Sequence, residues 1–188
     1  MFMKKLSLEE IRKIYNEYLV NDFPKDEVKP LSMIEAAYRR GGYLSYGYFE
    51  EPEELRAYAF FLVDGDNYLL DYYAVREEFR GMGFGSRFIR ELAEDTLKPV
   101  GCALLEIEDP AYALDEETRA MRESRRHFYM KNGLRDTRAE ATVFGVEYKI
   151  LEFPGKDSHS LEQIKTIYTD IYLTALNKDF VSRMIKMR

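Results

Sequence analysis

The chain is poor in the residues that build disulfides, metal centres and nucleophilic triads. Its 188 residues include one cysteine, two histidines and no tryptophan. A single cysteine excludes a disulfide within the chain and a metal site of the Cys-x-x-Cys type. Cys102 lies in an apolar run and is interpreted as a small core residue. Neither His127 nor His159 belongs to a Ser/His/Asp or Cys/His pattern, so we expect no metal site and no catalytic histidine.

Excess positive charge and long apolar segments are also lacking. The formal net charge is −6, which argues against a nucleic-acid partner and mildly favours cationic small-molecule ligands. No apolar run approaches the roughly 20 residues that span a bilayer. The opening residues, MFMKKLSLEE, have no apolar stretch of the kind found in signal peptides. These features predict a cytoplasmic protein that has no membrane partner.

What the sequence does contain is an alternation of helix and strand patterns that suits an α/β fold. The strands expected are residues 43–50, 55–63, 68–75, 103–107 and the region 143–152, which Gly145 interrupts. The helices expected are residues 31–40, 86–97 and 118–132, one that begins after Ser7 and one that begins after Ser160. The turn at residues 64–67 predicts an antiparallel hairpin, and residues 68–108 predict a parallel strand–helix–strand crossover. Tyr168 and Tyr172 fall on the apolar stripe of the last helix.

A glycine-rich turn, Arg80-Gly81-Met82-Gly83-Phe84-Gly85, lies between a predicted strand and a predicted helix. Glycines let backbone amides approach a ligand closely and adopt positive φ. The first amides of the following helix have no internal acceptor and carry partial positive charge. Such a turn can bind a pyrophosphate, and Arg80 and Arg87 flank it here.

Three interpretations of this turn compete. It could be a purely structural turn. It could be a dinucleotide site, because Gly81-x-Gly83-x-x-Ser86 is followed about twenty residues later by Glu106. Against this, five residues separate Val75 from Gly81, and the preceding strand belongs to an antiparallel hairpin. The third interpretation is a coenzyme A site.

The third interpretation is supported by a resemblance to a known family. Arg80-x-x-Gly83-x-Gly85, after a strand that ends at Ala74-Val75, resembles the acetyl-CoA signature of the GNAT acetyltransferase superfamily. The order of elements over roughly residues 40–150 is similar as well. The resemblance implies an α/β fold with a mixed, splayed β-sheet flanked by helices, known as the acyl-CoA N-acyltransferase fold. It also implies acetyl-CoA as co-substrate, bound by Ala74, Val75, Arg80, Gly81, Gly83, Phe84, Gly85 and Ser86.

A second landmark of that family is a helix that ends in Tyr, three residues, Gly and an apolar residue. Tyr129-Met130-Lys131-Asn132-Gly133-Leu134 resembles it. In relatives this tyrosine is the general acid toward the leaving thiolate. A phenol with a pKa near 10 can protonate a thiolate whose parent pKa is about 8.5. The alternative role for Tyr129 is packing at the helix end.

An amine nucleophile must also lose a proton, and a carboxylate can accept it. Glu106 and Glu108 lie on one face of a predicted strand. Leu105-Glu106-Ile107 is similar to the L-E-V segment whose glutamate is a common base in relatives, so Glu106 is the first choice. Glu108 and Asp71 are the other candidates for the base, and both are candidates for substrate contact, although strand carboxylates are often solvated edge groups.

One departure from the family concerns the helix that carries Tyr129. Relatives usually have Asn seven residues before the tyrosine, where this chain has Arg122. The helix is basic, with Arg119, Arg122, Arg125 and Arg126. These arginines could meet coenzyme phosphates, substrate or solvent.

The resemblance thus predicts an acetyltransferase that moves an acetyl group from acetyl-CoA directly to a primary amine of a small-molecule or peptide acceptor. An acyl-CoA-binding sensor without catalysis is the alternative. We divide the chain into an acetyltransferase domain, residues 1–153, and a helical C-terminal appendage, residues 154–188. The appendage is expected to pack on the domain or to form a homodimer interface.

Overall fold

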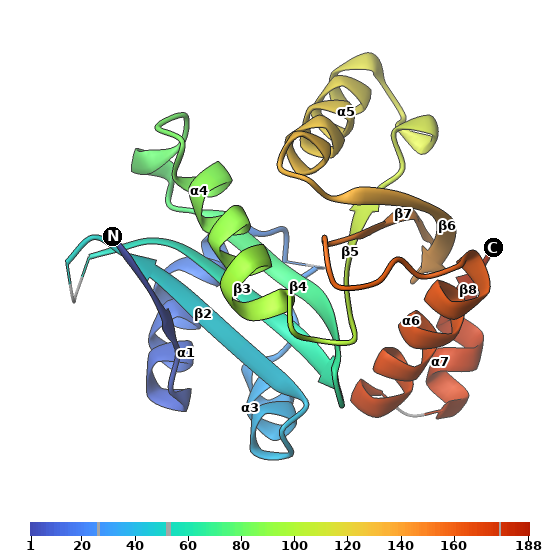
Figure 1. Ribbon diagram of the computed structural model, residues 1–188, viewed down its shortest axis with the longest axis horizontal. Coiled ribbons are helices and arrows are strands. Elements are labelled where there is room, and N and C mark those ends of the chain that lie inside the picture. The colour runs from blue at the N-terminus through green and yellow to red at the C-terminus, as the bar shows by residue number, and fades with distance from the viewer. Residues whose placement is uncertain (26, 52–53, 177) are drawn as a thin grey trace.

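One mixed β-sheet organises the molecule (Figure 1). The computed structural model describes residues 1–25, 27–51, 54–176 and 178–188. Within these residues the sheet has eight strands in the order β1-β2-β3-β4-β5-β7-β6-β8. The strands are β1 (Phe2–Lys5), β2 (Tyr43–Phe49), β3 (Leu55–Asp64), β4 (Asn67–Val75), β5 (Cys102–Glu108), β6 (Arg135–Val143), β7 (Val146–Glu152) and β8 (Ile185–Met187).

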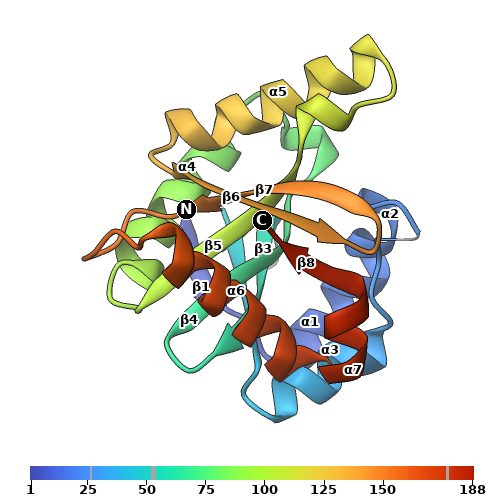
Figure 2. The same ribbon diagram turned by 90° about the vertical axis from the view of Figure 1, so that its right-hand side faces the viewer.

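Helices cover both faces of this sheet (Figures 1 and 2). One face carries α1 (Leu8–Ile14), which continues through Tyr15–Leu19 into α2 (Val20–Asp22), together with α3 (Leu31–Arg39), α6 (Leu161–Ala175) and α7 (Lys178–Met184). The other face carries α4 (Phe84–Glu91), extended by Leu92–Leu97, and α5 (Glu116–Lys131). Two hydrophobic cores result, one on each side of the sheet.

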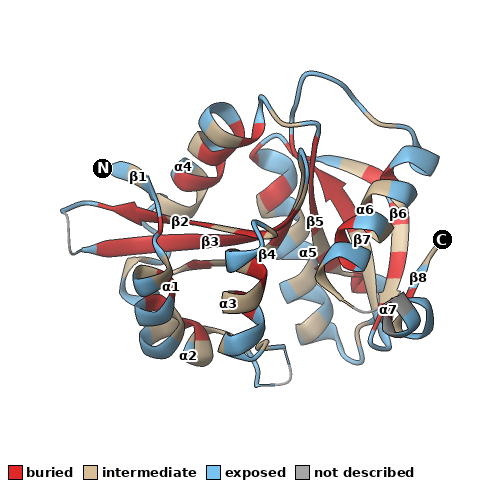
Figure 3. Cartoon of the chain, turned by 90° about the horizontal axis from the view of Figure 1, so that it is seen from below, coloured by how far each residue is buried: buried red, intermediate tan, exposed pale blue. Residues whose placement is uncertain are grey.

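Strand β3, in the interior of the sheet, shows why the molecule has three layers, with the sheet between two layers of helices. Nine of its ten residues are buried, all except Asp64, and Figure 3 shows the strand as a nearly continuous buried segment. Tyr58 and Phe60 pack into the core beneath α1, α3 and α6, whereas Ala59 and Phe61 pack into the core beneath α4 and α5. A strand covered on both faces needs an unbroken apolar run.

The parallel pair β4 and β5 separates partway along its length. Pairing covers Asn67–Leu70 with Cys102–Leu105 and ends there. At the same point, β4 contains a bulge against β3. Phe60 pairs with Tyr72 and Phe61 with Leu70, so the backbone of Asp71 has no pairing residue in β3. A bulge bends a strand and increases its twist. The bulge at Asp71 therefore accounts for the divergence of β4 from β5.

The predicted α/β fold, with a mixed and splayed sheet, is confirmed, as are the hairpin β3–β4 and the parallel order of β4 and β5. The strand region expected over residues 143–152 is interrupted at Gly145, as predicted, and β7 forms its longer part. Phe144 and Gly145, both with positive φ, form a tight turn between β6 and β7. Strand β6 was missed because small and polar residues such as Thr137, Ala139 and Ala141 fill its buried positions.

The C-terminal segment packs against the rest of the chain. On α6, Ile164, Tyr168 and Ile171 are buried in the core of the α1–α3 face. Strand β8 pairs antiparallel with β6, with Ile185 opposite Val143. Residues 161–176 and 178–187 thus cover part of one face of the sheet and extend its edge (Figure 2).

Candidate active site

A cleft of about 600 Å³ opens where β4 and β5 separate. It brings together residues that are far apart in the sequence, and seven of the predicted site residues line it. They are Asp71, Ala74 and Val75 of β4, Glu106 and Glu108 of β5, Arg80, and Tyr129 of α5. The other five, Gly81, Gly83, Phe84, Gly85 and Ser86, form the adjoining turn and the start of α4 and do not line the cleft.

The glycine turn has the geometry that a helix N-terminal anion site requires. Gly83 caps α4 in the left-handed conformation, with φ +85°, which glycine adopts without strain. The first helical hydrogen bond runs from the Arg87 amide to the Gly83 carbonyl at 3.1 Å, so the amides of residues 84–86 have no acceptor within the helix. A Cβ atom on Gly85 would lie 3.1 Å from Val75 Cγ2. Gly85 therefore lets α4 pack closely against the end of β4.

Arg80 connects the turn to the cleft wall. Its Nε donates to the Val75 carbonyl at 3.1 Å, and its Nη2 lies 3.4 Å from Asp22 Oδ1. Asp22 also accepts a hydrogen bond of 2.7 Å from the Tyr58 hydroxyl. These contacts hold the guanidinium beside the end of β4, at the cleft.

Arg56 was not among the predicted site residues, but it packs against the aromatic rings on either side of the glycine turn. It is buried in β3, and its guanidinium carbon lies 3.8 Å from the centroid of the Phe79 ring and 5.7 Å from that of Phe84. Glu50 and Glu54 pair with it. The available sequence signal was an arginine inside an otherwise apolar strand.

Tyr129 has a buried phenol ring and stands at the end of α5. The residue is 8% exposed, and no described residue forms a hydrogen bond with the hydroxyl. Its ring packs edge-on against Phe128 and Tyr73, with centroids 5.1 and 6.4 Å away. Burial raises the pKa of Tyr129 to about 12, although Arg125 acts in the opposite direction. Tyr129 therefore carries its proton throughout the neutral range.

Glu106 is half-buried and is held by neutral donors. The hydroxyl of Tyr168 donates to Oε2, and that of Tyr172 lies 3.0 Å from Oε1 and 3.1 Å from Oε2. Burial raises the pKa of Glu106, and the two phenols and the charge of Lys29 only partly offset that effect. Among the described residues, no lysine or arginine forms an ion pair with this carboxylate.

The other two predicted carboxylates are ion-paired. Asp71 is 2.5 Å from Lys29 Nζ and accepts a hydrogen bond of 2.5 Å from the Tyr43 hydroxyl. Burial alone would lower the pKa of Lys29, but the Asp71 carboxylate outweighs it and the pKa is raised. Glu108 lies 2.5 Å from Arg122 Nη2 and 3.4 Å from Arg125 Nη1. Of the three carboxylates, Glu106 alone keeps a negative charge that no cation pairs with directly.

These contacts also account for the basic face of α5. Arg122 and Arg125 bind Glu108, Arg126 lies 2.8 Å from Asp136, and Arg119 lies 3.2 Å from Glu116. Arg122, which stands where relatives carry asparagine, also donates to the Asp109 carbonyl at 3.0 Å. The basic helix is thus balanced by carboxylates of the same chain.

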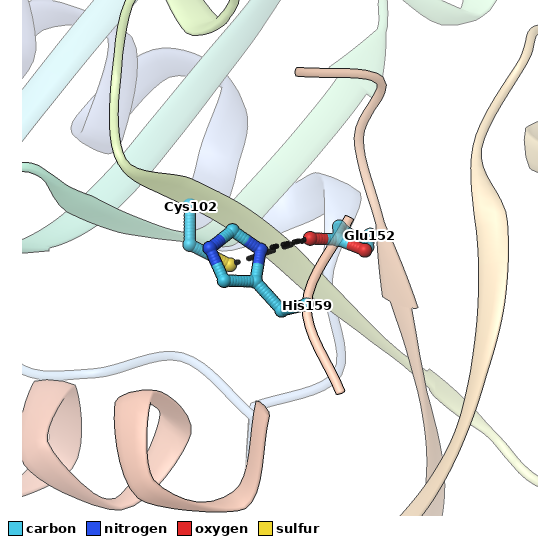
Figure 4. A group of neighbouring side chains, drawn as sticks. All are labelled: Cys102, Glu152 and His159. Carbon is cyan, nitrogen blue, oxygen red and sulfur yellow. Dashed lines mark hydrogen bonds and ion pairs between the residues drawn. The ribbon is translucent and has the colours of Figure 1, made fainter. Parts of the chain in front are cut away.

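A second cluster of titratable side chains lies at the opposite end of β5 (Figure 4). Cys102, Glu152 and His159 each place one potential ligand atom within 4.8 Å of the other two. His159 Nδ1 lies 2.5 Å from Glu152 Oε1, and Arg135 forms an ion pair with the other carboxylate oxygen. Burial raises the pKa of the Cys102 thiol to about 12. Because Arg135 already supplies a positive charge and the thiol is protonated, we interpret the cluster as structural.

Replacing Arg135 tests this interpretation. Glu152 has a side chain only 4% exposed, so Arg135→Met leaves a buried carboxylate without its cation. We expect the free energy of unfolding to fall by about 1–3 kcal/mol, measured by urea denaturation. Lys98→Met, which removes an exposed pair with Glu94, should change it by less than about 1 kcal/mol. Equal effects of the two variants would contradict a structural role for Arg135.

The mixed, splayed sheet flanked by helices is the acyl-CoA N-acyltransferase fold. The model of the Acetyltransferase (GNAT) family matches residues 8–133, which is more than half of the 188 residues, so the chain belongs to the GNAT family. No curated protein sequence matches the chain. Within the described residues, no helix is long and apolar enough to cross a membrane.

Solved structures show the same fold at low sequence identity. A protein assigned to the GNAT family from Bacteroides thetaiotaomicron aligns over 94% of this chain and 100% of its own, with a TM-score of 0.70 and 16% identity. The ribosomal-protein-S18-alanine N-acetyltransferase from Escherichia coli aligns over 84% and 98%, with a TM-score of 0.54 and 16% identity. A variant of the spermidine N-acetyltransferase from Vibrio cholerae aligns over 81% and 94%, with a TM-score of 0.56 and 14% identity.

Proposed function

We propose that this chain transfers an acetyl group from acetyl-CoA to a primary amine, directly and without a covalent enzyme intermediate. The observation that carries the proposal is the shared cleft of Tyr129 and Glu106. A protonated phenol and an unpaired carboxylate line the same opening between β4 and β5. Acetyl transfer to an amine needs one proton donor and one proton acceptor.

The residues present fit the coenzyme. Beyond Leu70, no described strand pairs with the edge of β4 that faces β5, so backbone groups of residues 71–75 are open to an amide-bearing ligand such as the pantetheine arm. The turn at Gly83 presents the free amides of residues 84–86 to a pyrophosphate, and Arg80 adds positive charge beside them. Ala74 and Val75 line the cleft between these two features.

The coenzyme supplies an acetyl thioester. The amine nitrogen forms a bond to the carbonyl carbon, and the carbon–sulfur bond breaks. An amine with a pKa of about 10.4 is neutral in only about one molecule in a few thousand at pH 7, so it binds as an ammonium ion and must lose a proton first. Glu106 accepts that proton and passes it to solvent. Tyr129 gives its proton to the departing sulfur and regains the second proton that the nitrogen loses.

The acceptor is a small-molecule or peptide amine, and the charge of Glu106 favours a cationic one. The deciding experiment incubates the protein and acetyl-CoA with diamines, polyamines, amino acids and peptides with free N-termini, and follows thiol release. We expect transfer to at least one amine class above the rate without amine. If acetyl-CoA binds by calorimetry but no amine is acetylated, the protein is an acyl-CoA-binding sensor instead.

A backbone substitution tests the proposed coenzyme turn. A Cβ on Gly83 meets no atom within 4 Å, so Gly83→Ala introduces only the strain of a left-handed alanine at φ +85°, worth about 1–2 kcal/mol. Relief of that strain moves the turn amides, and we expect the Kd for acetyl-CoA to rise about 5- to 10-fold.

The matched control is Gly65→Ala, in the turn between β3 and β4. Gly65 also has positive φ, +56°, and open space around it, but it precedes β4, whereas the turn at Gly83 follows the opposite end of that strand. Both variants should lose similar stability, by thermal melting, whereas only Gly83→Ala should weaken acetyl-CoA binding by titration calorimetry. An unchanged Kd in Gly83→Ala would remove the turn from the coenzyme site.

A further inference from the structure

Two tyrosines of the C-terminal helix α6 extend toward the proposed base. Tyr168 and Tyr172 are four residues apart, so they share one face of the helix. Both are buried, and their ring centroids are 5.1 Å apart. Both hydroxyls reach across to β5 and donate to the carboxylate of Glu106. A helix near the end of the chain therefore contacts the same side chain that lines the cleft.

We infer that Tyr168 and Tyr172 are positioning residues that hold the Glu106 carboxylate toward the acceptor amine, which makes α6 a working part of the acetyl-transfer site. The inference rests on the proposed function, in which Glu106 is the base. The tyrosines act through Glu106, because neither lines the cleft itself.

The hydrogen-bond geometry leaves room for the substrate. An ionised carboxylate offers about four acceptor sites on its two oxygens. Tyr168 contacts one oxygen, and Tyr172 lies nearly equidistant from both. Two donors therefore fix the plane of the carboxylate and leave acceptor sites for an ammonium group or a water molecule. Without them, the side-chain torsions of Glu106 could rotate the carboxylate away from the cleft.

The charges around Glu106 favour this role over simple packing. From other elements, Lys29, Asp71 and Tyr148 act electrostatically with it. Lys29 and Asp71 neutralise each other. The group formed by Lys29, Asp71 and Glu106 therefore keeps one net negative charge, on Glu106. Phenylalanine at 168 and 172 with an apolar residue at 106 would fill the same space without burying three polar groups. Burying these polar groups costs desolvation free energy, and such groups are expected in a core where function requires them.

The experiment removes one hydroxyl at a time, in Tyr168→Phe, Tyr172→Phe and the double variant. Each hydrogen bond favours the ionised carboxylate, so its loss should raise the pKa of Glu106. We expect the acid limb of the kcat/KM profile to move to higher pH by about one unit per hydroxyl, and kcat to fall about 10-fold per hydroxyl. The Kd for acetyl-CoA should stay within about twofold, because the coenzyme turn is untouched.

The control is Thr174→Val on the same helix, which loses a hydrogen bond of 2.8 Å to Asp64 instead. It should keep both kcat and the acid limb. If Thr174→Val reproduces the losses, the tyrosines act only by docking α6, and the inference is overturned. It is also overturned if both single variants keep the wild-type pH profile. The single variants remain informative if the double variant does not fold, since each removes one oxygen atom.

A readout independent of activity separates this inference from the proposed function. Carbon-13 NMR of glutamate-labelled protein follows each carboxyl through a pH titration, and the signal absent in Glu106→Gln identifies Glu106. Loss of either hydroxyl should move its midpoint upward by about one unit even in a protein that transfers nothing. A wild type without transfer activity would defeat the proposed function, whereas an unmoved midpoint would defeat the positioning role.

Discussion

The Tyr129→Phe protein should show a kcat lowered by about 10²-fold or more when the chemical step limits the rate. The change removes one hydroxyl, and no described residue forms a hydrogen bond with that hydroxyl, so little packing is lost. What disappears is the group that we propose as proton donor to the leaving sulfur. Single-turnover measurements with acetyl-CoA and the best amine from the panel isolate the chemical step.

The pH dependence of this loss is as informative as its size. Burial raises the pKa of Tyr129 to about 12, so the wild-type phenol stays protonated from about pH 6 to about pH 9. The ratio of wild-type to variant kcat should therefore be constant across that range. Tyr68→Phe, which removes a phenol hydroxyl from β4 outside the cleft, should leave kcat unchanged. A Tyr129→Phe protein with wild-type kcat in single turnover would show that the residue only packs the end of α5.

Much of the fold could be predicted from local patterns, because the local conformational preference of these segments agrees with their structure in the folded protein. The capping boxes at Ser7 and Ser160 start helices as expected, and the turn at Gly65 joins β3 to β4. Prediction failed where an element is defined by its partner rather than by its own residues. Strand β1 exists through its pairing with β2, and β8 through its pairing with β6. Neither strand has an apolar alternation of its own that is long enough to detect.

The candidate site likewise combines features that local sequence predicts with contacts between residues far apart in the chain. Glycine spacing and the Tyr129-to-Gly133 spacing are local, and the structure places Tyr129 in the cleft that the glycine turn at Gly83 adjoins. The partners of the carboxylates are not local. Lys29 meets Asp71 across 42 residues, and Tyr172 meets Glu106 across 66. Alternation along β5 placed Glu106 and Glu108 on one face, but only three-dimensional packing gives one of them phenols and the other arginines.

The Glu106→Gln protein should lose about 10²- to 10³-fold in kcat/KM at neutral pH. Glutamine has nearly the same shape and can still accept hydrogen bonds from Tyr168 and Tyr172, but it cannot take a proton from the ammonium ion. The reaction then depends on amine that is already neutral in solution. That fraction rises tenfold per pH unit up to an amine pKa of about 10.4. The deficit of Glu106→Gln should therefore shrink as pH rises, in contrast to the constant deficit of Tyr129→Phe.

A matched carboxylate distinguishes this effect from a change in overall charge. Glu140 lies on β6, pairs with Lys149 at 2.9 Å and does not line the cleft, so Glu140→Gln should keep the wild-type profile. For wild-type protein, burial raises the pKa of Glu106 above its ordinary value, which is about 4.3. Activity should accordingly fall on the acid side as the pH drops through that raised pKa and Glu106 becomes protonated. A Glu106→Gln protein whose deficit stays constant with pH would mean that water or another group accepts the amine proton, and Asp71, held by Lys29 in the same cleft, would be the next carboxylate to replace.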